Sequence, residues 1–284
     1  MSSQEGHNGI VPPLPAVAGV IGWPVAHSKS PLIHRFWLAK LGLDGDYSRF
    51  PVQPENLQQF IRALPATGLR GVNVTIPHKV AVMHLMDDLD ASAVAVGAVN
   101  TIKVFPDGRL GGSNTDIDGI LSPLAGYPVR GREVIILGSG GAARAALVAA
   151  QSLGAERVTL IARDAEKGMS LLNTVGQQGT VLPWGGPLGY SSDAALLFNA
   201  TSLGMTGQPP LNIDLSILPD DAVVFDAVYV PLETDLLRAA RARGLATIDG
   251  LQMLTGQAAL AFEIFYGVIP PRQHDDELRV LLSR

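Results

Sequence analysis

A strand that ends in a glycine-rich turn and continues as a helix constrains the fold more than any other feature of this 284-residue sequence. The apolar run at residues 134–137 predicts the strand, and the sequence Gly-Ser-Gly-Gly follows it at residues 138–141. The alanine-rich stretch after this turn predicts a helix, and residues 158–161 predict the next strand. A strand, a glycine turn, a helix and a strand within about 30 residues predict a unit that binds the pyrophosphate of a dinucleotide.

Each residue of the glycine turn has a separate role in that interpretation. Gly138 permits the tight turn, and Gly140 lets the backbone approach the ligand closely. The start of the helix, at Gly141 and Ala142, supplies free N–H groups and a favourable dipole to a phosphate. A short glycine cluster can also be purely structural, so the interpretation depends on the strands and the helix around it.

The residues after the second strand of this unit bear on the choice of cofactor. An acidic residue about 20 residues after the glycine turn binds a ribose 2′-hydroxyl, whereas an arginine accommodates a 2′-phosphate. Here the strand ends at Ala162, Arg163 and Asp164, and Lys167 lies one helical turn further on. Arg163 and Lys167 favour NADP, while Asp164 is expected to cap the next helix. Both cations could also be solvated surface charges.

Short apolar runs alternate with helical segments along most of the chain. Besides the unit above, strands are expected at residues 16–21, 47–52, 71–76, 98–104, 195–199, 223–226 and 246–248. Helices are expected at residues 31–41, with Ser30 as the N-cap, at 54–64, after Pro77, near Ala91, and beyond Gly250 with a break at Pro270 and Pro271. A hairpin turn is expected at residues 106–108. This alternation predicts an α/β protein with a mostly parallel sheet in its N-terminal part.

Composition narrows the range of partners. A hydrophobic fraction of 47% with 17% charged residues excludes a disordered chain, and a net charge of −5 offers no positive field to nucleic acid. The chain has no cysteine, and its six histidines lack metal-ligand spacing, so no metal is expected. The first basic residue is Lys29, and no uncharged apolar stretch approaches the length of a membrane span. We therefore expect a cytoplasmic protein with no membrane partner.

Polar side chains gather at four places where strands of the N-terminal part end. These clusters lie at residues 27–30, 73–79, 97–101 and 113–116. Ligands of parallel sheets bind at the carboxyl ends of the strands, which is where the clusters are expected. Together they offer hydroxyls, amides, one ammonium and one carboxylate, a set suited to a small polyhydroxylated acid.

At these motifs the sequence closely resembles the shikimate dehydrogenase family. The resemblance is carried by residues 22–31 (GWPVAHSKSP), 73–79 (NVTIPHK), 97–101 (GAVNT), 114–116 (NTD), 138–142 (GSGGA), 199–201 (NAT) and 257–259 (QAA). It implies an oxidoreductase of aromatic amino acid biosynthesis that reversibly reduces 3-dehydroshikimate to shikimate with NADPH. It also implies a substrate domain and a Rossmann-like NADP-binding domain with a cleft between them.

The resemblance further implies that Lys79 and Asp116 are the catalytic pair. Hydride that arrives at a ketone carbon leaves negative charge on the oxygen, which a cationic donor such as Lys79 can neutralise. Asp116 would anchor Lys79 and accept a hydrogen bond from a substrate hydroxyl. Lys79 could instead mainly orient the substrate, and a surface ion pair is the structural alternative. The other implied substrate residues are Ser28 and Ser30, assisted by Tyr229, at the carboxylate, and Asn73, Thr75, Asn100 and Gln257 at the hydroxyls.

For the cofactor, the resemblance implies contacts along the second half of the chain. The implied residues are Gly138, Ser139, Gly140, Gly141, Ala142, Ala162, Arg163, Asp164 and Lys167, with Ala227 and Gly250 near the nicotinamide. Two positions depart from the family pattern: Ile117 stands where a smaller residue is expected, and Ala162 replaces a frequent asparagine. The first departure puts the entry into the following helix in doubt, and the second could loosen the contacts with ribose.

The implied roles also divide the chain into domains. Because Gln257 must return to the substrate site, the substrate domain is expected to be discontinuous, at residues 16–120 and 251–284. The NADP-binding domain is expected at residues 121–250, with residues 124–132 as the linker between the two domains, and residues 1–15 are expected to form a flexible lead-in.

Two alternatives to this function stay open. A quinate/shikimate or aminoshikimate dehydrogenase would share the scaffold, although the two hydroxyls of Ser28 and Ser30 fit shikimate better. A non-catalytic NADPH-sensing protein would use the same nucleotide site, but retention of Lys79 and Asp116 argues against it. The sequence leaves open whether the protein is a monomer or a homodimer.

Overall fold

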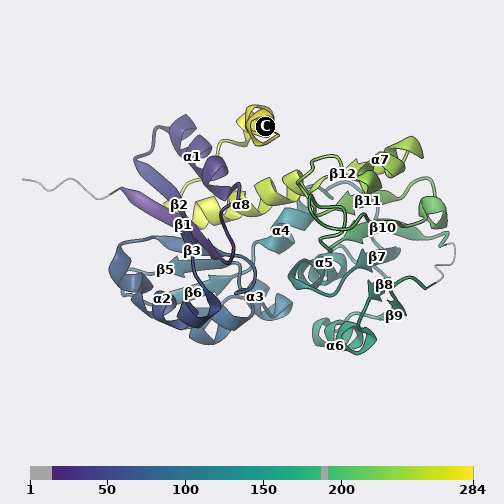
Figure 1. The fold of residues 1–284 in the computed structure, drawn as a ribbon, viewed down its shortest axis with the longest axis horizontal. Coiled ribbons are helices and arrows are strands. Elements are labelled where there is room, and N and C mark those ends of the chain that lie inside the picture. Colours follow the sequence, from purple (N-terminus) through teal and green to yellow (C-terminus); the bar gives the residue numbers. More distant parts are fainter. Residues whose placement is uncertain (1–14, 187–190, 284) are drawn as a thin grey trace, which may run out of the picture.

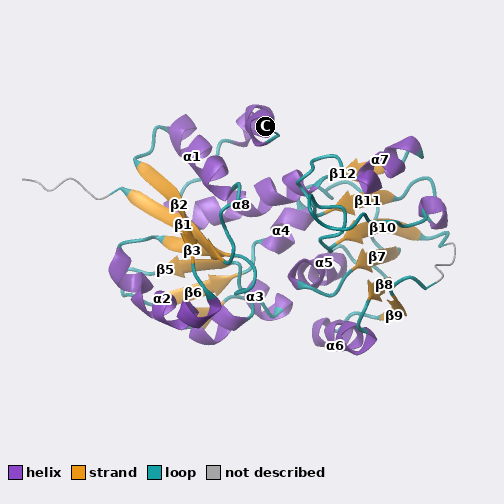
Figure 2. Cartoon of the chain, in the orientation of Figure 1, coloured by secondary structure: helices purple, strands orange, loops and turns teal. Residues whose placement is uncertain are grey.

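A computed structural model describes residues 15–186 and 191–283 of the chain. It contains two six-stranded sheets that lie side by side, with helices packed against both (Figures 1 and 2). The lead-in expected at residues 1–15 lies outside the described residues, apart from Pro15. Among the helices that the structure describes, none has the length and apolar character needed to cross a membrane.

The first sheet is mixed, with three parallel pairs and two antiparallel pairs. Its strands are β1 (Ala16–Gly22), β2 (Gly45–Pro51), β3 (Gly71–Val74), β4 (Asp88–Leu89), β5 (Thr101–Val104) and β6 (Leu110–Ser113), in the order β2-β1-β3-β5-β6-β4. β5 runs antiparallel to β3 and β6 because the expected turn at residues 106–108 closes a hairpin. Around it lie α1 (Ser30–Leu41), α2 (Leu57–Ala63), α3 (Ala91–Val96), and the short 3-10 helices η1 (Pro54–Asn56), η2 (Leu64–Thr67) and η3 (Ala81–Leu85).

The second sheet is fully parallel. Its strands are β7 (Glu133–Leu137), β8 (Arg157–Ala162), β9 (Gly179–Pro183), β10 (Ala194–Asn199), β11 (Val223–Asp226) and β12 (Ala246–Ile248). The order β9-β8-β7-β10-β11-β12 reverses direction between β7 and β10, and this is the strand order of a dinucleotide-binding sheet. The connecting helices are α5 (Gly141–Ser152), α6 (Ala165–Val175) and α7 (Asp235–Ala242), with η4 (Leu215–Ile217) before β11. The predicted α/β class with a Rossmann-like unit is confirmed.

Two helices connect the sheets. α4 (Asp116–Leu121) leads from the first sheet toward the second, and α8 (Gly250–Tyr266) returns from it. They cross so closely that a Cβ atom placed on Gly119 would lie 2.7 Å from the carbonyl oxygen of Met253. Beyond this crossing, Ala261 and Phe265 of α8 are buried against β1. After η5 (Arg272–His274), the last helix, α9 (Asp275–Leu282), packs on α1.

Local hydrogen bonds explain where the elements depart from the sequence-based prediction. Ser30 is the first residue of α1 rather than its N-cap, and its N–H donates to Ser28 Oγ at 3.3 Å. β5 begins at Thr101 instead of residue 98 because Gly97, with φ of +67°, ends α3 and the chain turns before it joins the sheet. Asp164 caps α6 as expected, since its carboxylate accepts the N–H of Lys167 at 2.9 Å.

Candidate active site

A cavity of about 260 Å³ lies between the two sheets. Its walls come from the ends of β1 and β3, the starts of α1, α4 and α8, and the segment that follows β11. The structure brings to it all nine residues expected to act on the substrate: Ser28, Ser30, Asn73, Thr75, Lys79, Asn100, Asp116, Tyr229 and Gln257. Residues that are as much as 229 positions apart in the sequence therefore surround one space.

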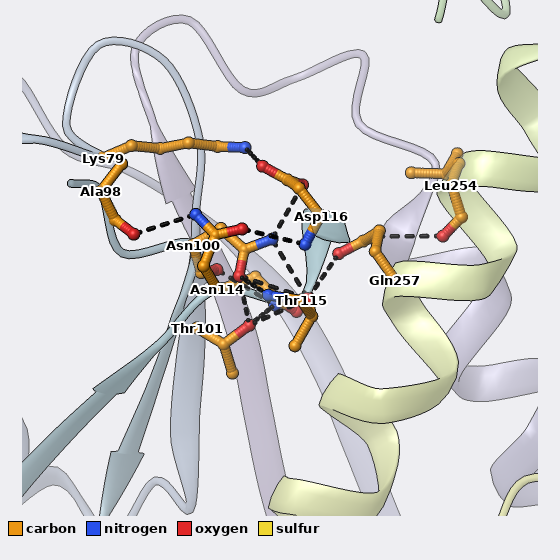
Figure 3. A network of polar contacts seen from close by, with 10 residues as sticks. Lys79, Ala98, Asn100, Thr101, Asn114, Thr115, Asp116, Leu254 and Gln257 are labelled. Carbon is orange, nitrogen blue, oxygen red and sulfur yellow. Dashed lines mark hydrogen bonds and ion pairs between the residues drawn. The ribbon is translucent and has the colours of Figure 1, made fainter. Parts of the chain in front are cut away.

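Lys79 and Asp116 form an ion pair in this cavity, with 2.5 Å between Nζ and Oδ2 (Figure 3). The side chain of Asp116 is 8% exposed and that of Lys79 is 22% exposed. Ion pairs between solvated side chains contribute little to stability, whereas this pair is largely shielded from water. The geometry therefore excludes the alternative of an ordinary surface ion pair.

Asn100 fixes the orientation of the Asp116 carboxylate. Asn100 Nδ2 donates to Asp116 Oδ1 at 2.8 Å, so the two carboxylate oxygens have different partners. Asn100 is itself held, because its Oδ1 accepts the backbone N–H of Thr115 at 2.8 Å. Asn114 completes the turn by accepting the N–H of Asp116 at 3.1 Å (Figure 3). The network aims one carboxylate oxygen at the ammonium of Lys79.

Asn73 connects this network to the core of the first sheet. Its Nδ2 donates to the carbonyl oxygen of Asn100 at 3.2 Å and to Thr101 Oγ1 at 2.9 Å. Its Oδ1 accepts the hydroxyl of Tyr47 at 2.6 Å. Tyr47 is fully buried, and this burial raises its pKa well above the ordinary value, which keeps the hydroxyl protonated as a donor. Tyr47 is a contributor that the sequence analysis missed, since nothing in its local pattern distinguishes it from a packing residue.

Three hydroxyl groups, those of Ser28, Ser30 and Tyr229, also line this cavity. Ser28 Oγ lies 3.2 Å from Ser30 Oγ, and the carbonyl oxygen of Ser28 accepts two hydrogen bonds from Arg49, at 3.0 Å and 2.5 Å. Half-buried Tyr229 lines the same cavity, and burial raises the pKa of its hydroxyl. Three protonated hydroxyls can donate together to an anionic group such as a carboxylate.

Gln257 reaches the cavity from α8. Its Nε2 donates to the carbonyl oxygen of Leu254 at 3.0 Å, and its Oε1 accepts from Thr115 Oγ1 at 3.3 Å (Figure 3). This second contact joins α8 to the turn that carries Asp116. Helix α8 is therefore part of the same polar network as the first sheet.

A second cavity, of about 660 Å³, opens where the order of the second sheet reverses. Six residues expected to bind the cofactor line it: Gly138, Ser139, Gly140, Arg163, Asp164 and Lys167. Gly138 has φ of +104°, which favours glycine, and a Cβ there would lie 2.9 Å from Thr201 Cγ2. Gly140 faces open space at the start of α5, which leaves its backbone accessible to a phosphate.

The remaining predicted cofactor residues lie elsewhere. Ala142, Ala227 and Gly250 line the first cavity, on the side of the second sheet. Gly141 and Ala162 line neither cavity, although a Cβ on Gly141 would lie 3.9 Å from Lys79 Cδ. The start of α5 thus faces one cavity at Gly140 and the other at Ala142, so a long ligand bound along this helix end would reach both.

The second cavity also contains residues that the sequence analysis did not assign, namely Trp184, Ala200, Thr201, Ser202, Leu203, Gln208 and Pro209. Residues 199–201 were noted only as part of the resemblance. Their position after β10 is informative once the strand order is known, because β10 is the neighbour of β7 at the reversal. The first cavity likewise contains unassigned Pro24, His27, Ile76, Met253 and Leu254.

His78, the neighbour of Lys79, has a structural role. Its ring is 1% exposed, and Nε2 lies 2.8 Å from the carbonyl oxygen of Val52. In the part of the chain that the structure describes, no group of three or more histidine, aspartate or glutamate side chains is arranged to hold a metal ion.

Comparison with known proteins identifies the family. Residues 20–102 match the model of the shikimate dehydrogenase substrate binding domain. A protein of Sphingopyxis alaskensis named shikimate dehydrogenase (NADP(+)) is 53% identical over 268 residues, which cover 93% of this chain and 96% of that protein. This chain belongs to the shikimate dehydrogenase family. The resemblance inferred from the motifs is thereby confirmed.

Solved structures extend the similarity to the whole fold. Shikimate 5-dehydrogenase of Thermus thermophilus, in complex with NADP(H) and shikimate, has a TM-score of 0.84 and 35% identity, and the match covers 94% of this chain and 99% of that one. Ligand-free 5-ketofructose reductase of Gluconobacter sp. strain CHM43 has a TM-score of 0.86 and 31% identity, with the same coverage. The shikimate dehydrogenase fold is therefore similar to that of an enzyme named for another ketone. Substrate preference within this fold depends on the side chains that line the cavity.

Proposed function

We propose that this chain is an NADP-dependent shikimate dehydrogenase, which reversibly reduces 3-dehydroshikimate to shikimate. The observation that carries this proposal is the shielded ion pair of Lys79 and Asp116 in a cavity that also contains serine, tyrosine and amide side chains. A ketone with a carboxylate and ring hydroxyls matches that set of groups, and the family membership of the chain supports the same chemistry.

In this proposal, Lys79 moves the proton. NADPH supplies the hydride that forms the new C–H bond, and Lys79 Nζ gives a proton to the carbonyl oxygen as negative charge develops there. In the oxidative direction, the neutral amine accepts the proton of the substrate hydroxyl. Asp116 Oδ2 holds Nζ at 2.5 Å and so fixes the position from which the proton is transferred.

The remaining polar groups would bind and orient the substrate. Ser28, Ser30 and Tyr229 would donate to its carboxylate. Asn73, Thr75, Asn100 and Gln257 would contact its hydroxyls, and Asp116 accepts from the hydroxyl nearest to it. Both amide hydrogens of Asn73 are already used within the protein, and its Oδ1 accepts from Tyr47, so the second lone pair of Oδ1 is what it can offer to a substrate hydroxyl.

The second cavity fits the cofactor. Gly138, Ser139 and Gly140 would hold the pyrophosphate at the start of α5, with Gly141 and Ala162 supporting the turn and the strand end from behind. Arg163 and Lys167 would bind the 2′-phosphate, with Asp164 capping α6 beside them. Ala142, Ala227 and Gly250 would surround the nicotinamide, because they line the cavity that contains Lys79.

The domain division is also part of the proposal. All strands of the first sheet lie within residues 16–113 and all strands of the second within residues 133–248, while α8 and α9 pack on the first sheet and its helix α1. This supports a discontinuous substrate domain at residues 16–120 and 251–284 around an NADP-binding domain at 121–250. A cytoplasmic location and a monomeric or homodimeric state, both considered at the level of sequence, remain proposals.

Steady-state kinetics tests the proposed function directly. The purified chain is assayed for NADPH or NADH formation with shikimate and with quinate, and for NADPH consumption with 3-dehydroshikimate and with 5-ketofructose. We expect the highest kcat/KM with the shikimate pair and NADP. A higher value for quinate with NAD would favour a quinate dehydrogenase, and NADPH binding without turnover of any substrate would favour the sensing protein.

A further inference from the structure

The C-terminal helix α9 packs on α1 and α8, two helices whose first residues line the first cavity. In Figure 1 it is the last helix, at the end marked C, beside α1 and near the start of α8. Leu278 and Leu282 of α9 are buried in one cluster with Ile33 and Trp37 of α1 and with Leu251 of α8. Two of the elements in this cluster, α1 and α8, begin at the wall of the cavity, since Ser30 and Gly250 both line it.

The first contact runs through Lys29. Its Nζ donates to the carbonyl oxygen of Leu282, at the end of α9. Lys29 lies between Ser28 and Ser30, both of which line the cavity, while Lys29 itself does not. The loop that would hold the substrate carboxylate is therefore attached to α9 at its middle residue.

The second contact runs through Arg279. Its Nη2 lies 2.7 Å from Asp249 Oδ2, and its Nη1 lies 3.3 Å from Asp249 Oδ1. Asp249 is 3% exposed and caps α8, because Oδ1 accepts the backbone N–H groups of Leu251 at 3.0 Å and Gln252 at 3.2 Å. Without Arg279, a buried carboxylate at the start of α8 would lose its cationic partner, which is strongly unfavourable.

We propose that α9 clamps the substrate cavity from outside, with Lys29 and Arg279 as positioning residues for substrate binding. Lys29 fixes the loop that carries Ser28 and Ser30 to the end of α9. Arg279, a residue of α9, fixes the start of α8, where Gly250 lies, and Gln257 follows two turns further along the same helix. The two walls are therefore connected through α9. Donors that are held in place before the substrate arrives lose less entropy when they bind it. This inference rests on the proposed function.

The test compares three single variants with the wild-type chain. Lys29→Met and Arg279→Met remove the two contacts and keep most of each aliphatic side chain. Lys40→Met is the matched control, because Lys40 Nζ pairs with Glu277 Oε2 at 2.6 Å and so also joins α1 to α9, but Lys40 lies at the far end of α1. For each variant we measure kcat, the KM for shikimate, the KM for NADP and the thermal midpoint.

We expect Lys29→Met to raise the KM for shikimate roughly tenfold, the factor that corresponds to about 1.4 kcal/mol of binding energy, and to leave the KM for NADP unchanged. Arg279→Met should raise both KM values, because Gly250 lies at the start of α8. Arg279→Lys keeps a cation beside Asp249, so its KM values should lie between those of Arg279→Met and the wild-type chain. It replaces Arg279→Met in the comparison if that variant does not fold.

The clamp is refuted if Lys29→Met and Arg279→Met lower the thermal midpoint but change the KM for shikimate no more than Lys40→Met does. That result would give α9 a purely structural role. Wild-type turnover of shikimate is measured in the same series, so failure of the proposed function can be distinguished from failure of the clamp. Absence of wild-type turnover overturns the proposed function and the clamp together, whereas normal turnover with unchanged KM values in the variants overturns the clamp alone.

Discussion

Both carboxylate oxygens and the backbone N–H of Asp116 have partners within the protein, so its position and orientation are fixed. Oδ2 binds Lys79, Oδ1 binds Asn100, and its backbone N–H binds Asn114. The carbonyl oxygen of Lys79 in turn accepts the N–H of Val99 at 2.8 Å, which ties the lysine segment to the chain just before Asn100. In the proposed reaction, Lys79 Nζ would therefore be preorganised as a proton donor, and preorganised donors of this kind contribute strongly to catalysis.

Replacing the lysine tests its role in proton transfer. We expect Lys79→Met to lower kcat by roughly 100- to 10,000-fold, the usual contribution of a general acid and base, while NADPH still binds. Stopped-flow kinetics and fluorescence titration of NADPH measure the two effects. Lys103→Met, at an exposed position on β5, is the control. Near-normal turnover in Lys79→Met would remove Lys79 from the chemistry and favour a role in orientation only.

The proposed preference for NADP can be tested at a single residue. Arg163 lines the second cavity beside Lys167, and neither forms an ion pair within the described part of the chain. We expect Arg163→Ala to raise the Kd of NADPH much more than that of NADH, because only NADPH carries the 2′-phosphate. Isothermal titration of both nucleotides measures this, with Arg238→Ala on the exposed face of α7 as the control. Equal weakening of both nucleotides would contradict a 2′-phosphate contact.

The sequence predicted the residues that line the substrate cavity better than those that support them. Lys79, Asn100 and Asp116 stand in motifs at strand ends, where side-chain chemistry is visible without coordinates. Tyr47 and Trp184 were missed because only the folded structure shows their surroundings. Tyr47 donates a hydrogen bond to Asn73, and Trp184 lines the second cavity. Such contacts depend on how segments that are distant in the sequence pack together, so the local sequence pattern does not predict them.

At the scale of elements, hydrophobic runs located every strand of the second sheet except β9. β10, β11 and β12 were predicted within one residue. β10 and β11 are buried throughout and mostly apolar, as expected of central parallel strands, whereas β12 is a short, half-buried edge strand. β9 was not predicted, since its residues are largely exposed at the sheet edge. The expected helix at residues 54–64 is divided among η1, α2 and η2, which sequence periodicity cannot distinguish from one continuous helix.

The crossing of α4 and α8 provides a prediction at this scale. In Gly119→Ala, the new Cβ would lie 2.7 Å from the carbonyl oxygen of Met253, so the two helices must separate. We expect the free energy of unfolding to fall by about 1–3 kcal/mol, as for overpacked cores, and kcat to fall because α4 begins with Asp116. Urea denaturation and steady-state kinetics measure the two effects.

Ser170→Ala provides the control for that crossing. Ser170 lies on the exposed face of α6, and its substitution should change stability by less than about 0.5 kcal/mol. Equal stability of Gly119→Ala and the wild-type chain would show that the α4 and α8 crossing tolerates a methyl group.

At the scale of the whole molecule, the returning C-terminal helices complete the core of the first sheet. His34 of α1 is fully buried there, stacked on Tyr47 of β2 at 4.0 Å between ring centroids and surrounded by Phe262, Phe265 and Tyr266 of α8. Neither ring nitrogen of His34 has a hydrogen-bond partner among the described residues. The cluster joins the two chain segments of the proposed substrate domain. The protonation state of His34 should therefore affect the free energy of global unfolding.

Burial lowers the pKa of His34 from 6.5 to about 3. The unfolded chain therefore binds a proton at His34 below its ordinary pKa, whereas the folded chain does so only in stronger acid. In the window between these two values the unfolded state holds the extra proton, so the stability contributed by neutral His34 is lost as pH falls. The contribution of this residue to the free energy of unfolding should decrease by roughly 1.4 kcal/mol for each pH unit within that window.

His34→Phe tests this prediction because phenylalanine keeps an aromatic ring and cannot be protonated. Urea denaturation is measured at several pH values from pH 7, where His34 is mostly neutral in both states, down to about pH 5, where it is neutral when folded and protonated when unfolded. We expect the stability of His34→Phe to depend less on pH than that of the wild-type chain, whatever its absolute stability at neutral pH. His84→Gln, at an exposed position in η3, should retain the wild-type dependence. Parallel pH profiles for His34→Phe and the wild-type chain would show that the buried imidazole is protonated without unfolding, and that water reaches the aromatic cluster around it.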